Sequence, residues 1–123
     1  MDFRDKQAIY LQIGEYILEQ ILLGEIPIGG KMPSIRELAV QIEVNPNTVQ
    51  RTYDFLQQKE IISTKRGIGY FVNDNARERI IEFRKEQFIE HELPNVFRNI
   101  HLLGFDFDDL KQRYLTYIQT NFN

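Results

Sequence analysis

The stretch Ser34–Val72, SIRELAVQIEVNPNTVQRTYDFLQQKEIISTKRGIGYFV, decides the fold because it contains two helix starts in close succession. Ser34 and Glu37 form a capping-box pattern, in which each side chain accepts a hydrogen bond from the other residue's backbone N–H. Asn45 can cap a second helix, and Pro46 suits the first helical position because its missing N–H would have no partner there. Two helices separated by about three residues predict a helix-turn-helix.

Strand and helix patterns on either side complete the expected fold. Ile61–Lys65 and Tyr70–Val72 have the composition of two short strands, joined through the tip Gly67-Ile68-Gly69. Before the helix-turn-helix, apolar residues spaced three and four apart predict a helix from about residue 6 to residue 23. Three helices followed by a hairpin predict a mainly α winged helix-turn-helix with a small β-hairpin.

The remaining residues predict a helical tail. A helix is expected to begin near residues 74–75, and Pro94 is expected to kink or divide it. A last helix is expected to start near Asp106. We therefore expect two parts, a winged helix-turn-helix domain over residues 1–73 and a helical tail over residues 74–123.

The tail carries many apolar side chains for its length. Two helices alone cannot easily bury them, so pairing with a second copy of the chain through these C-terminal helices is the expected arrangement. The alternative is a monomer whose tail folds back on the winged helix. The aromatic residues that we expect to be exposed on a single copy are Phe83, Phe88, Phe97, Phe105, Tyr114, Tyr117 and Phe122.

Composition excludes several classes of protein. The chain has no cysteine, so it can hold neither a disulfide framework nor a thiolate zinc site. No apolar run approaches the roughly 18 residues of a membrane span, and we expect a cytoplasmic protein that does not contact a membrane. His91 and His101 lack a ligand set with metal-binding spacing, and no catalytic triad or paired-carboxylate pattern stands out. The sequence therefore predicts no enzyme, no metal and no cofactor.

Charge is unevenly distributed along the chain. The formal net charge is −3, whereas a nucleic-acid binder often carries a basic excess. Residues 31–72, however, hold six cations against four carboxylates and carry +2, and the segments before and after are both acidic. The only positive segment therefore coincides with the helix-turn-helix and the hairpin.

The second helix of the predicted motif has two different faces. At 100° per residue, one side should pack on the core and the opposite side is polar. The core side holds Val49, Thr52, Tyr53 and Leu56. In the major groove of B-DNA, arginine can bind guanine bidentately, and asparagine or glutamine can bind adenine. The candidates for contact with base edges are Asn47, Thr48, Gln50 and Arg51. A solvated helix face without a ligand is an equally open alternative.

Cations at two further places suit contact with phosphates. Arg36 lies in the first turn of its helix, where a cation costs roughly 0.3–1 kcal/mol unless an anion is nearby. The alternative is a surface ion pair with Glu43 or another carboxylate, which would contribute little. Lys65, Arg66 and Gly67 form the hairpin tip, which could lie along phosphates or enter a minor groove.

Residues 8–72 closely resemble the winged-helix domain of the GntR family of bacterial transcription regulators. The resemblance rests on GGKMPSIRELA, NTVQRTYDFL and RGIGYFV, which are specific when taken together. The short tail is similar to that of the YtrA subfamily, which lacks a large effector domain. The resemblance implies a homodimer that binds a palindromic operator in double-stranded DNA, usually as a repressor.

The family's DNA contacts correspond to Arg36, Thr48, Arg66 and Gly67 of this chain. The complete set that we predict to bind DNA is Ser34, Arg36, Asn47, Thr48, Gln50, Arg51, Lys65, Arg66 and Gly67.

This chain departs from the family pattern at three positions. Pro46 and Gln50 stand where many members carry arginine, and the arginine is one step later, at Arg51. Glu60 replaces the glycine that usually precedes the first strand of the wing. The base sequence that this chain recognises is therefore expected to differ from that of better-known branches.

Two alternatives remain open. One is a winged helix that binds a protein partner and never contacts DNA. The other adds a metabolite pocket between the tails, but a tail this short is expected to leave little room for a cavity of roughly 300 Å³. A small-molecule effector is therefore not expected.

Overall fold

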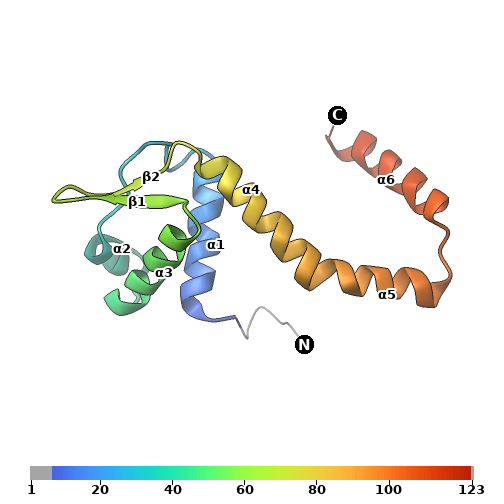
Figure 1. The fold of residues 1–123 in the computed structure, drawn as a ribbon, viewed down its shortest axis with the longest axis horizontal. Helices are drawn as coiled ribbons and strands as arrows, with labels where there is room; N and C mark the ends of the chain where they lie inside the picture. Colours follow the sequence, from blue (N-terminus) through green and yellow to red (C-terminus); the bar gives the residue numbers. More distant parts are fainter. Residues whose placement is uncertain (1–6, 123) are drawn as a thin grey trace. The chain divides into compact units, whose positions relative to one another are not determined.

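The structure of the chain, a computed structural model, describes residues 7–122 (Figure 1). Its elements follow the predicted order, and the mainly α fold with a small β-hairpin is confirmed. The elements are α1 (Ile9–Leu22), α2 (Ile35–Ile42), α3 (Pro46–Gln58), β1 (Ile62–Lys65), β2 (Gly69–Val72), α4 (Ala76–Gln87), a π-helical turn (Phe88–Glu92), α5 (Leu93–Leu103) and α6 (Phe107–Phe122). Lys6, the expected start of the first helix, lies outside the described residues.

Contacts divide the chain into two compact units, with the boundary between Arg84 and Lys85. The first unit contains the helix-turn-helix, the hairpin and most of α4, and the second contains the remaining helices. The functional division that we expect after residue 73 stays a prediction.

The first unit has a hydrophobic core to which its helices and its hairpin all contribute. Ile17 and Leu18 of α1, Tyr53 of α3, Ile62 of β1 and Ile80 of α4 have at most 1% of their surface exposed. Burying one such side chain stabilises the fold by about 1.5–3 kcal/mol. Because α1 and α3 share this core, the position of α3 is determined largely by packing.

The helix-turn-helix begins with the two caps that the sequence predicts. The backbone N–H of Glu37 donates to the Ser34 hydroxyl over 3.1 Å, and the Ser34 N–H donates to the Glu37 carboxylate over 3.2 Å. The side chain of Asn45 accepts a bond of 2.8 Å from the Asn47 N–H, and Pro46 is the first residue of α3. Both helix starts are therefore encoded locally.

The hairpin has an antiparallel register that places Ile62 and Val72 opposite each other on its inner face. Ile62 pairs with Val72, and both side chains are buried. Lys65 pairs with Gly69 at the far end, where the strands leave the core. The tip therefore projects away from the body of the first unit (Figure 1).

A further segment, residues 29–32, pairs with the outer edge of β2, which the sequence analysis did not predict. The Met32 N–H donates to the Tyr70 carbonyl oxygen over 2.8 Å, and the Val72 N–H donates to the Gly30 carbonyl oxygen over 2.9 Å. This pairing satisfies backbone groups at the edge of the hairpin and attaches the base of the wing to the segment that precedes α2.

The start of α4 belongs to the core of the first unit. The prediction that Phe83 is exposed was wrong: its side chain is buried, and its ring meets that of Phe55 edge-on at a centroid distance of 5.5 Å. Ala76 and Ile80 lie on the same face of α4 and are fully buried. The first turns of α4 therefore pack on the winged helix, and the choice between a dimer and a monomer stays a prediction.

In the second unit, the chain passes through the π-helical turn into α5. Pro94 is at the start of α5 and cannot donate a hydrogen bond to the preceding turn, so a wider turn accommodates it. The expected division of the helix at Pro94 is confirmed. Gly104, with a φ of 70°, ends α5 in the left-handed conformation.

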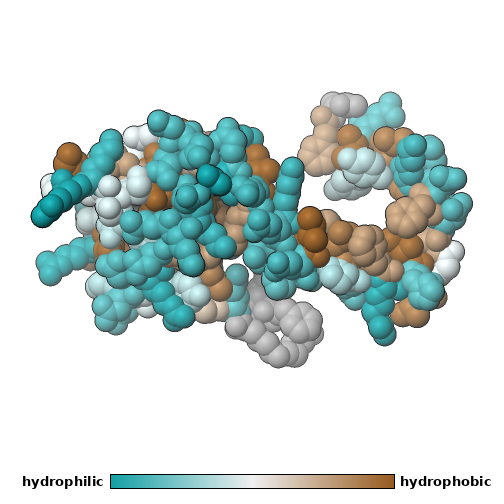
Figure 2. Space-filling view, in the orientation of Figure 1, coloured by the Kyte–Doolittle hydropathy of each residue, from teal (hydrophilic) through white to brown (hydrophobic). Residues whose placement is uncertain are grey.

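The second unit leaves its apolar side chains exposed. None of the described residues of the π-helical turn, α5 or α6 is buried. Figure 2 shows apolar residues at the surface of α5 and of the segment that joins it to α6. No helix in the described part of the chain is long and apolar enough to cross a membrane.

An open apolar hollow lies between α5 and α6. Its volume is about 470 Å³. It lies within one copy of the chain and is open to solvent, so the expectation about a pocket between two tails stays a prediction. It is lined by Leu93, Val96, Phe97, Asn99, Ile100, Phe105, Phe107 and Leu110.

Candidate nucleic-acid interface

Two adjacent side chains on the inner face of α3 hold this helix in place. The Thr52 hydroxyl donates to the carbonyl oxygen of Tyr10 in α1 over 2.8 Å and lies 3.1 Å from the Thr48 carbonyl oxygen. The Tyr53 hydroxyl donates over 2.7 Å to the carbonyl oxygen of Pro33, shortly before α2. These bonds fix the rotation of α3 about its own axis, and the opposite face therefore stays turned outward.

The inner face of α3 is buried as predicted. The side chains concerned are Val49, Thr52, Tyr53 and Leu56. Burial raises the pKa of the Tyr53 hydroxyl well above its ordinary value, because the charged phenolate would lose its hydration. The group therefore remains a neutral donor to Pro33.

The predicted base-edge candidates lie on the outer face or the flank of α3. Asn47, Gln50 and Arg51 are exposed, and Thr48 is half-buried. The side-chain amide of Gln50 donates to the Asp54 carboxylate over 3.0 Å, which orients the amide along the helix. The polar side chains thus form one outward face, with a carboxylate within it.

The predicted residues at the start of α2 have two different roles in the structure. The Ser34 side chain caps the helix, and its hydrogen bonds to Glu37 hold the pKa of that carboxyl group below its ordinary value. Arg36 is exposed in the first turn. Among the described residues Arg36 makes no ion pair, so the alternative pairing with Glu43 is not observed.

The hairpin tip presents its two cations on a turn that needs glycine. Gly67 has a φ of 76°, in the left-handed region that favours glycine, and the Ile68 N–H closes the turn by donating to the Lys65 carbonyl oxygen over 2.9 Å. Lys65 and Arg66 are exposed. Figure 1 shows the tip on the side of the first unit where α2 and the start of α3 lie.

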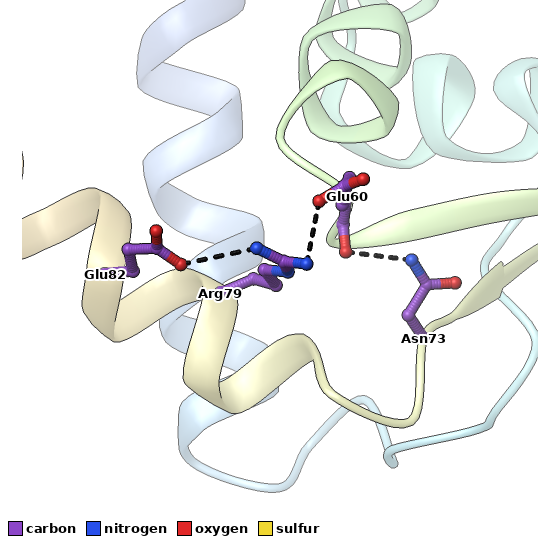
Figure 3. A network of polar contacts seen from close by, with 4 residues as sticks. All are labelled: Glu60, Asn73, Arg79 and Glu82. Atoms are coloured by element: carbon purple, nitrogen blue, oxygen red, sulfur yellow. Dashed lines mark hydrogen bonds and ion pairs between the residues drawn. The ribbon is translucent and has the colours of Figure 1, made fainter.

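A polar network connects the base of the wing to α4 (Figure 3). The Asn73 amide donates to the Glu60 carbonyl oxygen over 2.8 Å. The Glu60 carboxylate lies 3.0 Å from the Arg79 guanidinium, which also lies 3.4 Å from Glu82. Glu60 has a φ of 61°, so the position at which the family resemblance expects glycine does adopt the left-handed conformation.

Two predicted site residues make aromatic contacts that were not predicted. The guanidinium carbon of Arg51 lies 4.0 Å from the ring centroid of Tyr10, and the ammonium of Lys65 lies 4.3 Å from that of Phe71. The second contact could have been found from the hairpin register, because the two residues lie diagonally across the strands. The contact between Arg51 and Tyr10 joins residues that are far apart in the sequence, so no local pattern indicates it.

A helix-turn-helix, an outward polar face on its second helix and a wing with cations at the tip define a winged-helix DNA-binding protein. Residues 9–72 match the family described as bacterial regulatory proteins, gntR family. The chain belongs to this family, whose members are DNA-binding regulators of transcription and not enzymes.

Individual relatives resemble nearly the whole chain. The transcriptional repressor YtrA of Bacillus subtilis is 36% identical over 112 residues, which cover 91% of this chain and 85% of YtrA. The regulator YhcF of the same organism is 32% identical over 95% of both chains. The crystal structure of a GntR-family regulator from Bacteroides thetaiotaomicron is 44% identical, has a TM-score of 0.82, and covers 92% of this chain and 98% of its own. The similarity therefore includes the short tail.

Proposed function

We propose that this regulator is a homodimeric repressor that binds a palindromic operator, with α3 in the major groove. The outward face of α3 carries this proposal. Thr52 and Tyr53 hold the inner side of the helix, and Asn47, Gln50 and Arg51 on the outer side carry the groups that suit base edges. The similarity to YtrA, whose name describes a repressor, supports repression.

The cations outside α3 would position the protein on the DNA backbone. Arg36 lies at the positive end of α2, where a phosphate would turn its unfavourable position into a favourable one. Lys65 and Arg66 lie at the exposed tip of the wing. Such contacts are independent of base sequence and contribute the salt-dependent part of the affinity.

Dimerisation is proposed for the second unit because its own helices do not bury its apolar side chains. Phe97 and Phe107, which line the hollow between α5 and α6, are 52% and 66% exposed. A symmetric dimer would insert equivalent side chains from each copy into the hollow of the other and would place two copies of α3 on the DNA.

With the hollow filled in this way, we propose no small-molecule effector. The proposed function would place the protein in the cytoplasm.

The experiment that tests this function compares Arg51→Ala with Lys65→Ala on a duplex selected from random DNA and on a scrambled duplex. Arg51→Ala should cost about 1–3 kcal/mol on the selected duplex and little on the scrambled one. Lys65→Ala should weaken binding to both and reduce the slope of log affinity against log salt by about one unit. Fluorescence anisotropy over a salt series measures all of these quantities.

Lys111→Ala in α6 is the matched control, because it removes the same charge outside the predicted DNA-binding set. It should leave both affinities and the salt slope unchanged. Equal losses for Arg51→Ala and Lys65→Ala on both duplexes would contradict the proposed roles. Absence of salt-dependent binding in the unmodified protein would favour the protein-interaction alternative.

A further inference from the structure

The strongest unassigned feature near the candidate interface is the contact between Arg51 of α3 and Tyr10 of α1. The guanidinium carbon lies 4.0 Å from the centroid of the tyrosine ring, well within the roughly 6 Å limit of a cation–π interaction. Arg51 is exposed and Tyr10 is half-buried. The arginine therefore rests on a ring that is partly fixed in the fold.

Tyr10 is held in the fold by one contact of its backbone and one contact of its ring. The backbone carbonyl of Tyr10 accepts the hydrogen bond from the buried Thr52 hydroxyl, and the Tyr10 ring meets Phe55 nearly edge-on, at 6.3 Å between centroids and 78° between planes. Phe55 in turn packs against the buried Phe83. A series of three rings thus connects the surface arginine to the core of the first unit.

The contact with the ring leaves the arginine able to bind DNA. The guanidinium is planar, and a contact through its face would leave its five N–H donors directed outward in the plane. Among residues 7–122, no side chain or carbonyl accepts a hydrogen bond from Arg51. The same side chain can therefore rest on Tyr10 and donate two bonds to the edge of a guanine.

We propose that Tyr10 is a positioning residue that holds Arg51 in the orientation in which it contacts a base edge. An exposed arginine loses considerable rotamer freedom when it binds, and a fixed ring reduces that loss before DNA arrives. The contribution of Tyr10 belongs to sequence-specific binding, because phosphate contacts do not depend on the orientation of Arg51. This inference rests on the proposed function, in which Arg51 contacts a base.

Tyr10→Leu and Tyr10→Phe, measured on a duplex selected from random DNA and on a scrambled duplex, test the proposal. Tyr10→Leu removes the aromatic face and should weaken binding to the selected duplex about 3- to 10-fold, with no change on the scrambled duplex. Tyr10→Phe keeps the ring and should bind both duplexes like the unmodified protein. Thermal unfolding of each variant verifies that the fold is retained.

A double-mutant cycle with Arg51→Ala separates positioning from a general effect on α1. Once Arg51 is absent, Tyr10→Leu should have no further effect on either duplex. Equal losses on both duplexes, tighter binding by Tyr10→Leu, or an undiminished effect in the Arg51→Ala background would overturn the inference. If the unmodified protein does not prefer the selected duplex, the proposed function itself fails. If it does prefer that duplex but Tyr10→Leu changes nothing, only this inference fails.

Discussion

Two glutamates have a backbone conformation that favours glycine. Glu43, at the end of α2, has a φ of 56°, and Glu60, after α3, has a φ of 61°. Left-handed conformations cost an L-residue with a Cβ roughly 1–2 kcal/mol. At Glu60 the resemblance to the family identified the position, because glycine is usual there. Nothing in the local pattern identified Glu43.

We expect Glu60→Gly to be more stable than Glu60→Ala by about 1 kcal/mol, because glycine adopts the left-handed conformation without strain. Both variants lose the ion pair with Arg79. The difference between them therefore reports the free-energy cost of the left-handed backbone conformation at this position. Urea unfolding followed by circular dichroism measures the difference. An alanine variant as stable as the glycine variant would show that the backbone at this position is not strained.

The capping box of α2 should make part of the stability depend on pH. Hydrogen bonds from Ser34 lower the pKa of the Glu37 carboxyl group from its ordinary value of 4.5. A lowered pKa in the folded state means that the stabilisation is present above this ordinary value. It is lost as the pH falls through the lower value of the folded protein.

Glu37→Gln keeps a hydrogen-bonding side chain in the box but cannot ionise. We expect the glutamine variant to be less stable than the unmodified protein at neutral pH, and the difference to shrink as the solution becomes acidic. Denaturant unfolding at pH 7 and at about pH 3 measures this change. A difference of the same size at both pH values would show that the charge of Glu37 contributes nothing.

Among the elements, α3 depends most on contacts that a sequence pattern cannot show. Its start could be predicted because Asn45 and Pro46 are local signals, and its inner face followed from helical periodicity. The partners of Thr52 and Tyr53 could not be predicted, because they are backbone carbonyls distant in the sequence. The same reason explains why the pairing of residues 29–32 with β2 was missed.

For α4, the sequence pattern could not show which apolar side chains are buried. The periodicity predicted a helix there, but it did not show that Phe83 packs on Phe55 while other aromatic residues of the tail remain exposed. The predicted DNA-binding residues were placed on α2, α3 and the wing from local signals and the family resemblance. Tyr10 was not among them, because its contact with Arg51 exists only after α1 and α3 pack together.

For α3, we expect Tyr53→Phe to lower the free energy of unfolding by about 1–2 kcal/mol, because the Pro33 carbonyl loses its buried donor. Tyr70→Phe is the matched control, since the Tyr70 hydroxyl has no hydrogen-bond partner among the described residues. It should change stability by less than about 0.5 kcal/mol. Equal effects in urea unfolding would contradict the role assigned to the Tyr53 bond.

For the whole molecule, the proposed dimer follows from the difference between the two units. The first unit buries a core of its own. In the second unit, none of the described residues of the π-helical turn, α5 or α6 is buried. A dimer would cover this surface, and it would also double the modest positive charge of residues 31–72 on the DNA. Charge on a single copy is a weak attraction for DNA.

We expect Phe97→Ser to weaken the dimer strongly, because a symmetric interface loses the same side chain twice. At about 1.5–3 kcal/mol for each buried phenylalanine, the dissociation constant should rise by about 10²- to 10⁴-fold. Sedimentation equilibrium measures it, and Gln119→Ser on α6 serves as a polar control that should leave it unchanged. An unmodified protein that stays monomeric at all accessible concentrations would contradict the proposal.

The most direct test of the central claim is selection of binding sites from a random duplex library with the unmodified protein. If two copies of α3 contact base edges in a symmetric dimer, the recovered sequences should contain an inverted repeat, with half-site centres about one helical turn or a multiple of it apart. Recovery of no enriched sequence, or of a single motif without an inverted copy, would contradict the account.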